Sequence, residues 1–374
     1  MPESLSNHLC VQVLAGASPP FLIMKKIPFV LCALIASVSA SASEPIDHIL
    51  FGSCGHQDKA MPILDSIIDD QPDLFLFLGD NVYGDTEDMQ LLAQKYQKLA
   101  QKPRFKKLRA TTPLIAIWDD HDFGENDAGK GFPQKEASRQ IMLDFWQEPK
   151  TSPRRSRADG IYTSYTYNGA DQRIHVIMPD LRWNRDDINT VSKLTYVTER
   201  KSNNMGPYAV SENPTASMLG EAQWQWLETE LLKPAKIKVI ASSLQVLADF
   251  TGWEAWANFP HDINRLKSFI KDHGINGVIL ISGDTHWGEV SYLHEGLDYP
   301  LWEVTSSGLT EEWKEVSPNK NRIGAYTHQV NYGAIDIDWT MKDPLISLSL
   351  KNANGEVLNK HSFTLSSISP YTQD

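Results

Sequence analysis

Six short apolar runs constrain the fold of this chain more than any other feature. They occupy residues 49–51, 74–78, 114–117, 174–178, 237–240 and 278–281. Runs of this length are too short for helices and are typical of strands buried on both faces of a sheet. Helical patterns alternate with them, as in residues 219–232, where apolar residues recur at helical spacing. The sequence therefore predicts an α/β fold.

Polar residues of the kinds that bind metals and anions follow these runs. They are Cys54, Asp80, Asp120, Arg182, Gln245 and Asp284, in chain order. A single Gly-Asp pair after a strand is usually turn chemistry. Six polar strand ends along one chain favour a different interpretation, because ligands bind at the carboxyl ends of strands in open α/β sheets. We therefore expect these side chains to converge.

The first residues of the chain carry a separate pattern. Met24-Lys25-Lys26 precedes an apolar segment at 27–35 and small residues at 38–42, which is typical of a secretory signal peptide. We expect residues 1–42 to be an upstream extension plus signal peptide, with the true start at Met24, and residues 43–374 to be one domain. The apolar segment is too short to span a bilayer stably, so we expect cleavage and export to the periplasm or medium.

Cysteine content and net charge limit the classes of protein to which this chain can belong. Removal of residues 1–42 takes away Cys10 and Cys32 and leaves Cys54 as the only thiol, so no internal disulfide is expected. Cys54 fits either a small buried apolar side chain or a metal-bound thiolate. The net charge of −12 gives no support to a specific nucleic-acid binder, which needs a basic surface.

The candidate ligands fall into two sets. Sulfur, nitrogen and oxygen donors come from Cys54, Asp80, Tyr83 and His286, and such a mixture suits a transition metal. Oxygen donors alone come from Asp120 and Asp284, together with Asn126 or Gln245, and suit calcium, manganese or magnesium. Two adjacent cations that share a carboxylate and a solvent oxygen form the clamp used for displacement at phosphorus.

Three further side chains have candidate roles around such a centre. His121 lies among carboxylates in Asp119-Asp120-His121-Asp122, where a carboxylate can orient a protonated imidazole that acts as general acid. Arg182 and Arg185 could bind phosphate through their guanidinium groups. The alternative for both arginines is a structural ion pair with a neighbouring aspartate.

An aromatic segment follows Gln245. Trp253, Trp256 and Phe259 lie close together in it. Packing in the core explains such a cluster more often than a substrate wall does, although a Trp-rich loop near the metals could line a pocket for a lipid, nucleotide or sugar ester.

Six blocks of sequence, occurring in order, resemble one known family. They are Gly52-Ser53-Cys54, Gly79-Asp80-Asn81-Val82-Tyr83-Gly84, Trp118-Asp119-Asp120-His121-Asp122, Asp180-Leu181-Arg182-Trp183-Asn184-Arg185, the segment 219–227, and Ser282-Gly283-Asp284-Thr285-His286-Trp287. They are similar to the PhoD-like alkaline phosphatases, a branch of the calcineurin-like metallophosphoesterases. The resemblance extends over residues 49–308.

The resemblance implies a four-layer α/β/β/α sandwich in a single domain with a binuclear metal centre. It places Fe³⁺ at Cys54, Asp80, Tyr83 and His286, with Asp80 bridging to Ca²⁺, for which Mn²⁺, Mg²⁺ or Zn²⁺ are alternatives. Asp120 and His121 take the place of the superfamily's Asn-His pair, with Asn126 as the alternative to Asp120 as ligand. We expect this chain to depart from longer relatives in two ways, without their separate N-terminal β domain and without a long C-terminal helix over the metals.

These observations together predict an exported phosphoesterase. We expect it to hydrolyse small or polymeric phosphomonoesters, and by extension phosphodiesters, through a metal-bridging hydroxide. One alternative is a dedicated phosphodiesterase or a phospholipase D-like enzyme. Another is a catalytically silent protein that binds phosphate or a polymer. The sequence leaves the oligomeric state open.

Overall fold

Two mixed β-sheets form the centre of the fold in the computed structural model, which describes residues 45–370. The first sheet contains β1 (His48–Gly52), β2 (Leu74–Leu78), β3 (Leu114–Ile117), β11 (Asn331–Asp338), β12 (Leu345–Asn352) and β13 (Val357–Thr364). The second contains β4 (Thr163–Tyr167), β5 (Ile174–Met178), β6 (Ile237–Ala241), β7 (Val278–Ser282), β8 (Gly288–Leu293), β9 (Leu301–Ser306) and β10 (Arg322–Thr327). Their spatial orders are β13-β12-β11-β1-β2-β3 and β10-β8-β9-β7-β6-β5-β4.

All six predicted strands are present, three in each sheet. In the first sheet β1, β2 and β3 run parallel, with Ile49 opposite Leu74 and Phe75 opposite Leu114. In the second sheet β5, β6 and β7 run parallel in the same way. Every residue of β2, β5, β6 and β7 is buried, as expected for parallel strands covered on both faces. The parallel strands of both sheets supply the site described below.

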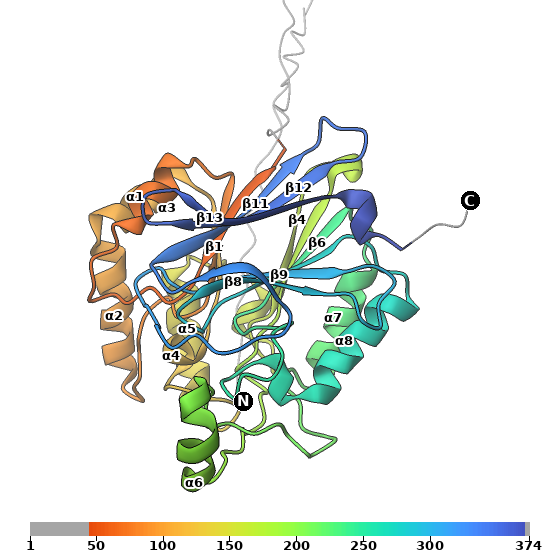
Figure 1. Ribbon diagram of the computed structural model, residues 1–374. Coiled ribbons are helices and arrows are strands. Elements are labelled where there is room, and N and C mark those ends of the chain that lie inside the picture. The colour runs from red at the N-terminus through yellow and green to blue at the C-terminus, as the bar shows by residue number, and fades with distance from the viewer. Residues whose placement is uncertain (1–44, 371–374) are drawn as a thin grey trace, which may run out of the picture. The chain divides into compact units, whose positions relative to one another are not determined.

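Helices cover the outer faces of the two sheets (Figure 1). Beside the first sheet lie α1 (Ile63–Asp69), α2 (Met89–Gln101), α3 (Pro103–Thr111) and α5 (Lys135–Phe145), and beside the second lie α7 (Glu221–Leu232) and α8 (Pro260–Asp272). In α2, Leu92, Tyr96 and Leu99 recur at helical spacing and are buried, and the side chain of Asp88 caps the first turn. The structure confirms the predicted single-domain α/β/β/α sandwich.

The remaining helical segments are short. They are α4 (Asp120–Phe123), α6 (Lys193–Thr195), η1 (Pro153–Arg155), η2 (Ala170–Gln172), η3 (Tyr196–Arg200), η4 (Lys201–Asn203), η5 (Trp256–Asn258) and η6 (Leu365–Ile368). The α4 segment matters most for function, because it starts where β3 ends and carries Asp120 and His121.

Side chains between the two sheets hold them face to face. The ring of Trp302 on β9 stacks on Phe363 of β13, with 4.7 Å between the ring centroids. The Asn359 side-chain amide on β13 donates to the carbonyl of Ala325 on β10 at 2.7 Å. Packing of this kind fixes the two sets of strand ends relative to each other.

The predicted signal peptide, with Cys10 and Cys32, lies outside the described residues. Across residues 45–370, no helix has both the length and the apolar character that crossing a bilayer requires.

Candidate metal centre

The loops after β1, β2, β3 and β7 bring the predicted ligands together. Cys54, Asp80, Asp284 and His286 all have left-handed backbone conformations, with φ of 61°, 50°, 73° and 63°. Such φ values are uncommon for residues other than glycine and cluster where the surrounding structure holds functional side chains in place. Turns of this kind let a side chain point back over the end of its own strand.

Four overlapping groups of potential ligands lie at this edge. Ligand atoms lie within 4.8 Å of one another in Cys54-Asp80-His286, in Asp80-Asp120-His121, in Asp119-Asp120-Asp284 and in Asp120-Asp127-Glu254. The Cys54 Sγ is 3.3 Å from Asp80 Oδ2, and the Tyr83 hydroxyl is 3.0 Å from His286 Nε2. Residues separated by more than 200 positions in sequence therefore meet. Asp80 belongs to two of the groups and Asp120 to three.

Gly79 makes the approach of β2 and β3 possible. Its φ is +103°, and a Cβ atom at this position would lie 2.4 Å from the Cβ and 2.8 Å from the backbone nitrogen of Asp119. Only glycine fits such a contact without displacing the backbone. This close contact sets the separation between Asp80 and the Asp119-Asp120 pair.

The cluster contains buried carboxylates that the protein only partly compensates with hydrogen bonds or positive charge. Asp80 Oδ1 is buried and has no hydrogen-bond partner among residues 45–370, and Asp120 Oδ1 has only the Arg182 guanidinium, 3.5 Å away and beyond hydrogen-bond geometry. Burial, reinforced by neighbouring carboxylates, raises the pKa of Asp80 and of Asp284 well above the usual range. Buried acids without partners are costly to ionise unless positive charge is supplied. The residues therefore fit bound metal ions.

The softer donors also fit a metal. Burial raises the pKa of the Cys54 thiol, and a cation reverses such a shift by stabilising the thiolate. Burial lowers the pKa of His286 to about 4, so its imidazole is neutral near pH 7 and free to coordinate. Ser307 Oγ lies 3.2 Å from the Cys54 sulfur and accepts a hydrogen bond from the His286 backbone N–H at 2.7 Å, so one hydroxyl contacts both candidate ligands.

His121 lies beside the cluster with its own carboxylate partner. Its Nδ1 is 2.6 Å from Asp85 Oδ1. Burial lowers the pKa of His121, but the contact with Asp85 and the charge of Asp120 outweigh it and raise the pKa to about 9. The imidazole is therefore protonated at neutral pH, which is the state that a general acid needs.

Arg182 and Arg185 take the structural alternative. Arg182 is fully buried; its Nε lies 2.5 Å from Asp119 Oδ1 and its Nη1 lies 2.6 Å from Glu254 Oε2. Arg185 is also buried and pairs with Glu254 at 3.2 Å. This geometry favours the structural ion pair over phosphate binding, because buried carboxylates contact the Arg182 guanidinium, while Glu254 and the backbone carbonyls of Asp127 and Asp186 contact that of Arg185.

Asp120 and Asn126, the two alternatives for an oxygen ligand of the second metal, differ in burial. Asp120 is buried, and Arg182 lies 3.5 Å from its Oδ1. Although burial raises its pKa, Arg182, His121 and backbone N–H groups lower the pKa of Asp120 to about 2. Asn126 is exposed, and its amide donates to Asp127 at 2.6 Å. Both side chains line one cavity with a volume of about 170 Å³, which also reaches Asp284 and His286.

Several site residues escaped the sequence analysis. They are Asp85, Asp119, Asp127, Glu254 and Ser307. Asp119 stands beside Asp120 in a carboxylate-rich block, which was a usable signal. No sequence pattern marks Glu254 as a site residue, since its partners Arg182 and Arg185 are about seventy positions away. In the aromatic segment Trp256 and Phe259 are buried in the core, whereas Trp253 lines the cavity.

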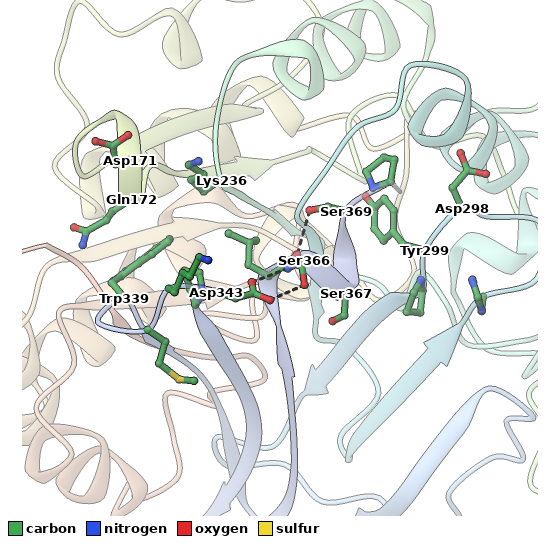
Figure 2. A pocket seen from close by; sticks show the side chains of 17 residues that line it. Asp171, Gln172, Lys236, Asp298, Tyr299, Trp339, Asp343, Ser366, Ser367 and Ser369 are labelled. Atoms are coloured by element: carbon green, nitrogen blue, oxygen red, sulfur yellow. Dashed lines mark hydrogen bonds between the residues drawn. The ribbon is translucent and has the colours of Figure 1, made fainter. Parts of the chain in front are cut away.

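A larger cavity, with a volume of about 840 Å³, opens at the other edge of the sheets (Figure 2). Its lining includes Gln172, Lys236 and Pro300, which come shortly before β5, β6 and β9. The Asp343 carboxylate there accepts hydrogen bonds from the backbone and hydroxyl of Ser366 at 3.0 and 2.6 Å. None of the groups of potential metal ligands among the described residues lies in this cavity.

The fold and the site define an α/β sandwich with a candidate two-cation centre at the carboxyl ends of parallel strands from both sheets. The chain belongs to the PhoD-like phosphatase family, whose model matches residues 49–343. It is 27% identical over 228 residues to alkaline phosphatase D of Bacillus subtilis (strain 168), covering 54% of this chain and 35% of that relative. The chain thus spans about a third of the length of this curated relative.

Two solved structures share the fold. A structure of PhoD aligns with a TM-score of 0.59 at 17% identity, covering 87% of this chain and 72% of the other. A structure of GAP50, described as the anchor in the inner membrane complex of Plasmodium, aligns with a TM-score of 0.53 at 10% identity, covering 86% of this chain and 90% of the other.

Proposed function

We propose that this protein is an exported, binuclear metal-dependent phosphoesterase. Its expected substrates are phosphomonoesters, with phosphodiesters as the alternative. Family membership supports phosphatase chemistry, while a fold by itself does not fix function. The GAP50 structure has this fold and is described as an anchor. The proposal therefore depends on the residues of the site and not on the fold.

One observation carries the proposal. Candidate ligands from four separate loops form overlapping groups of three whose ligand atoms lie within 4.8 Å of one another; they include Cys54, Asp80, Asp120, Asp284 and His286. Among the described residues, the buried Asp80 Oδ1 and Asp120 Oδ1 have no hydrogen-bond partner, and only Asp120 Oδ1 has a cation near it, Arg182 at 3.5 Å. A structural cluster would satisfy these atoms with protein donors, because an unpaired buried polar atom costs about 1–3 kcal/mol.

We assign the ligands to two sites on their chemistry. Cys54, Asp80, Tyr83 and His286 would hold one cation, for which Fe³⁺ is proposed. Asp80, Asp120 and Asp284, with Asn126 as the further or alternative donor, would hold the second, for which Ca²⁺ is proposed and Mn²⁺, Mg²⁺ or Zn²⁺ are alternatives. When bound, such a pair supplies a nucleophile at neutral pH and neutralises phosphoryl oxygens.

The remaining step falls to His121. Its protonated imidazole would donate a proton from Nε2 to the departing alkoxide, while Asp85 holds Nδ1 and so fixes the orientation of the ring. Arg182 would hold the carboxylates near His121 in position without contacting the substrate. It pairs with Asp119 and Glu254 and adds positive charge near Asp120. In this account Arg182 is a positioning residue that does not reach the substrate.

A metal and ester assay on the same preparations tests the proposal. Metal content and turnover of p-nitrophenyl phosphate and bis-p-nitrophenyl phosphate are measured for the wild type and for Asp80→Ala. We expect Asp80→Ala to lose both metals and turnover. Asp343→Ala, at the other cavity, is the matched control and should change neither. Full metal loading without turnover of either ester in the wild type would instead favour a silent phosphate- or polymer-binding protein.

Export is proposed on the sequence of residues 24–42. Mass spectrometry of the mature protein tests it: a first residue near Ser41 or Ser43 is expected, and a chain that keeps Met24 in an exported fraction contradicts the proposed cleavage.

A further inference from the structure

The cavity over the cluster has aromatic walls. Trp253, Trp287 and Trp313 line it together with Asp120 and Asp284. Among the described residues that line this cavity there is no lysine or arginine. The one cationic side chain in this lining is His121, which is assigned to the departing oxygen. A ligand whose phosphoryl group is held at the cluster therefore meets indole rings with the rest of its structure.

Trp253 is held firmly by its neighbours. The next residue, Glu254, is fixed by the ion pairs with Arg182 and Arg185 at 2.6 and 3.2 Å. On one side the indole packs against the backbone of Gly206, where an added Cβ would lie 2.6 Å from Trp253 Cδ2. The Trp253 Nε1 is buried and has no hydrogen-bond partner within residues 45–370, so packing and not hydrogen bonding holds the indole.

Trp313 is positioned from the opposite loop. Its backbone N–H donates to the His286 carbonyl at 3.0 Å, so the loop that carries it is attached to a candidate metal ligand. Its indole is 38% exposed and meets Trp253 edge to face, with 5.7 Å between ring centroids. Edge-to-face and offset contacts of this kind also suit a third ring, because the aromatic quadrupole favours them.

We propose that Trp253 and Trp313 form an aromatic subsite that receives a planar ring carried by the organic group of the phosphate ester. The inference rests on the proposed function, because it takes the phosphoryl group to be bound at the metal cluster. The subsite names a substrate class for the proposed enzyme, which is aryl or heteroaryl phosphate esters. The metal ligands would bind the phosphoryl group, and the two indoles would bind the ring.

Binding of two phosphonates tests the subsite without any turnover. Phenylphosphonate and methylphosphonate share the same head group and differ only in the ring. Calorimetry on metal-loaded protein should give a dissociation constant for phenylphosphonate at least roughly fivefold lower than that for methylphosphonate. Trp253→Leu and Trp313→Leu should each reduce this preference roughly three- to tenfold, whereas Trp253→Phe, which keeps a ring, should retain most of it.

Trp339→Leu is the matched control, because Trp339 lines the larger cavity at the other edge of the sheets (Figure 2). It should leave the preference unchanged. A wild type that binds both phosphonates equally, or a preference that survives both Trp253→Leu and Trp313→Leu, overturns the subsite. Because binding is read directly, a metal-loaded protein that hydrolyses no ester but shows the ring preference contradicts the proposed function and supports the subsite.

Discussion

Arg182→Met should be among the most destabilising single substitutions in this protein. The guanidinium is fully buried and lies within 2.5–2.6 Å of Asp119 and Glu254 and 3.5 Å from Asp120. Methionine fills much of the space but leaves these carboxylates buried without their counter-charge. Removing one partner of a buried ion pair costs about 3–5 kcal/mol, which lowers the melting temperature of a domain of this size by roughly 4–7 °C.

Urea unfolding followed by circular dichroism, with metals removed by a chelator, measures this cost without a contribution from bound cations. Arg265→Met is the control, since Arg265 pairs with Glu221 and Glu228 at the surface and is 33% exposed. The control should lose less than about 1 kcal/mol. A loss for Arg182→Met no greater than that of the control would refute the view that this arginine holds the acidic cluster together.

Three other substitutions have definite expected outcomes. His121→Ala should keep the metals and lose roughly 10²–10⁴-fold in turnover of alkyl esters, with a much smaller loss on p-nitrophenyl esters, whose leaving group needs no proton; equal losses on both classes would rule out a general acid. Cys54→Ser should selectively lower the iron content measured by elemental analysis, because a hydroxyl is a poorer ligand than a thiolate for a transition metal; unchanged iron would show that the sulfur is not a ligand. Gly79→Ala should destabilise the fold by more than about 1 kcal/mol in urea unfolding and reduce metal binding, because the new Cβ would clash with Asp119. Gly131→Ala is the control and should be close to neutral, because Gly131 has open space around it.

The parallel strands and their polar ends could be predicted because the information is local. A run such as Leu74–Leu78 is apolar throughout and ends at glycine, so both its burial and its limits are visible in the sequence. The convergence of Cys54, Asp80 and Asp284 followed from a general rule about strand ends. Family resemblance then supplied the pairing of the two sheets, which the local pattern alone could not give.

The buried partners of the site could not be predicted, because long-range packing decides them. Arg182 had carboxylates close by in sequence, yet it pairs with Asp119 and Glu254, both more than sixty positions away. Asp85 was overlooked as the partner of His121 because a lone aspartate in a polar loop has no distinguishing pattern. Trp253 and Trp256 belong to one segment, and only the backbone turn between them determines which one reaches the cavity.

The most direct test of the central claim is the metal content of the purified protein. Elemental analysis of the wild type should give two metal ions per chain, and Asp80→Ala, which removes the carboxylate common to the Cys54 and Asp120 groups, should lose both. A wild type that binds no metal after incubation with iron and calcium, or an Asp80→Ala variant that keeps two ions, contradicts the account.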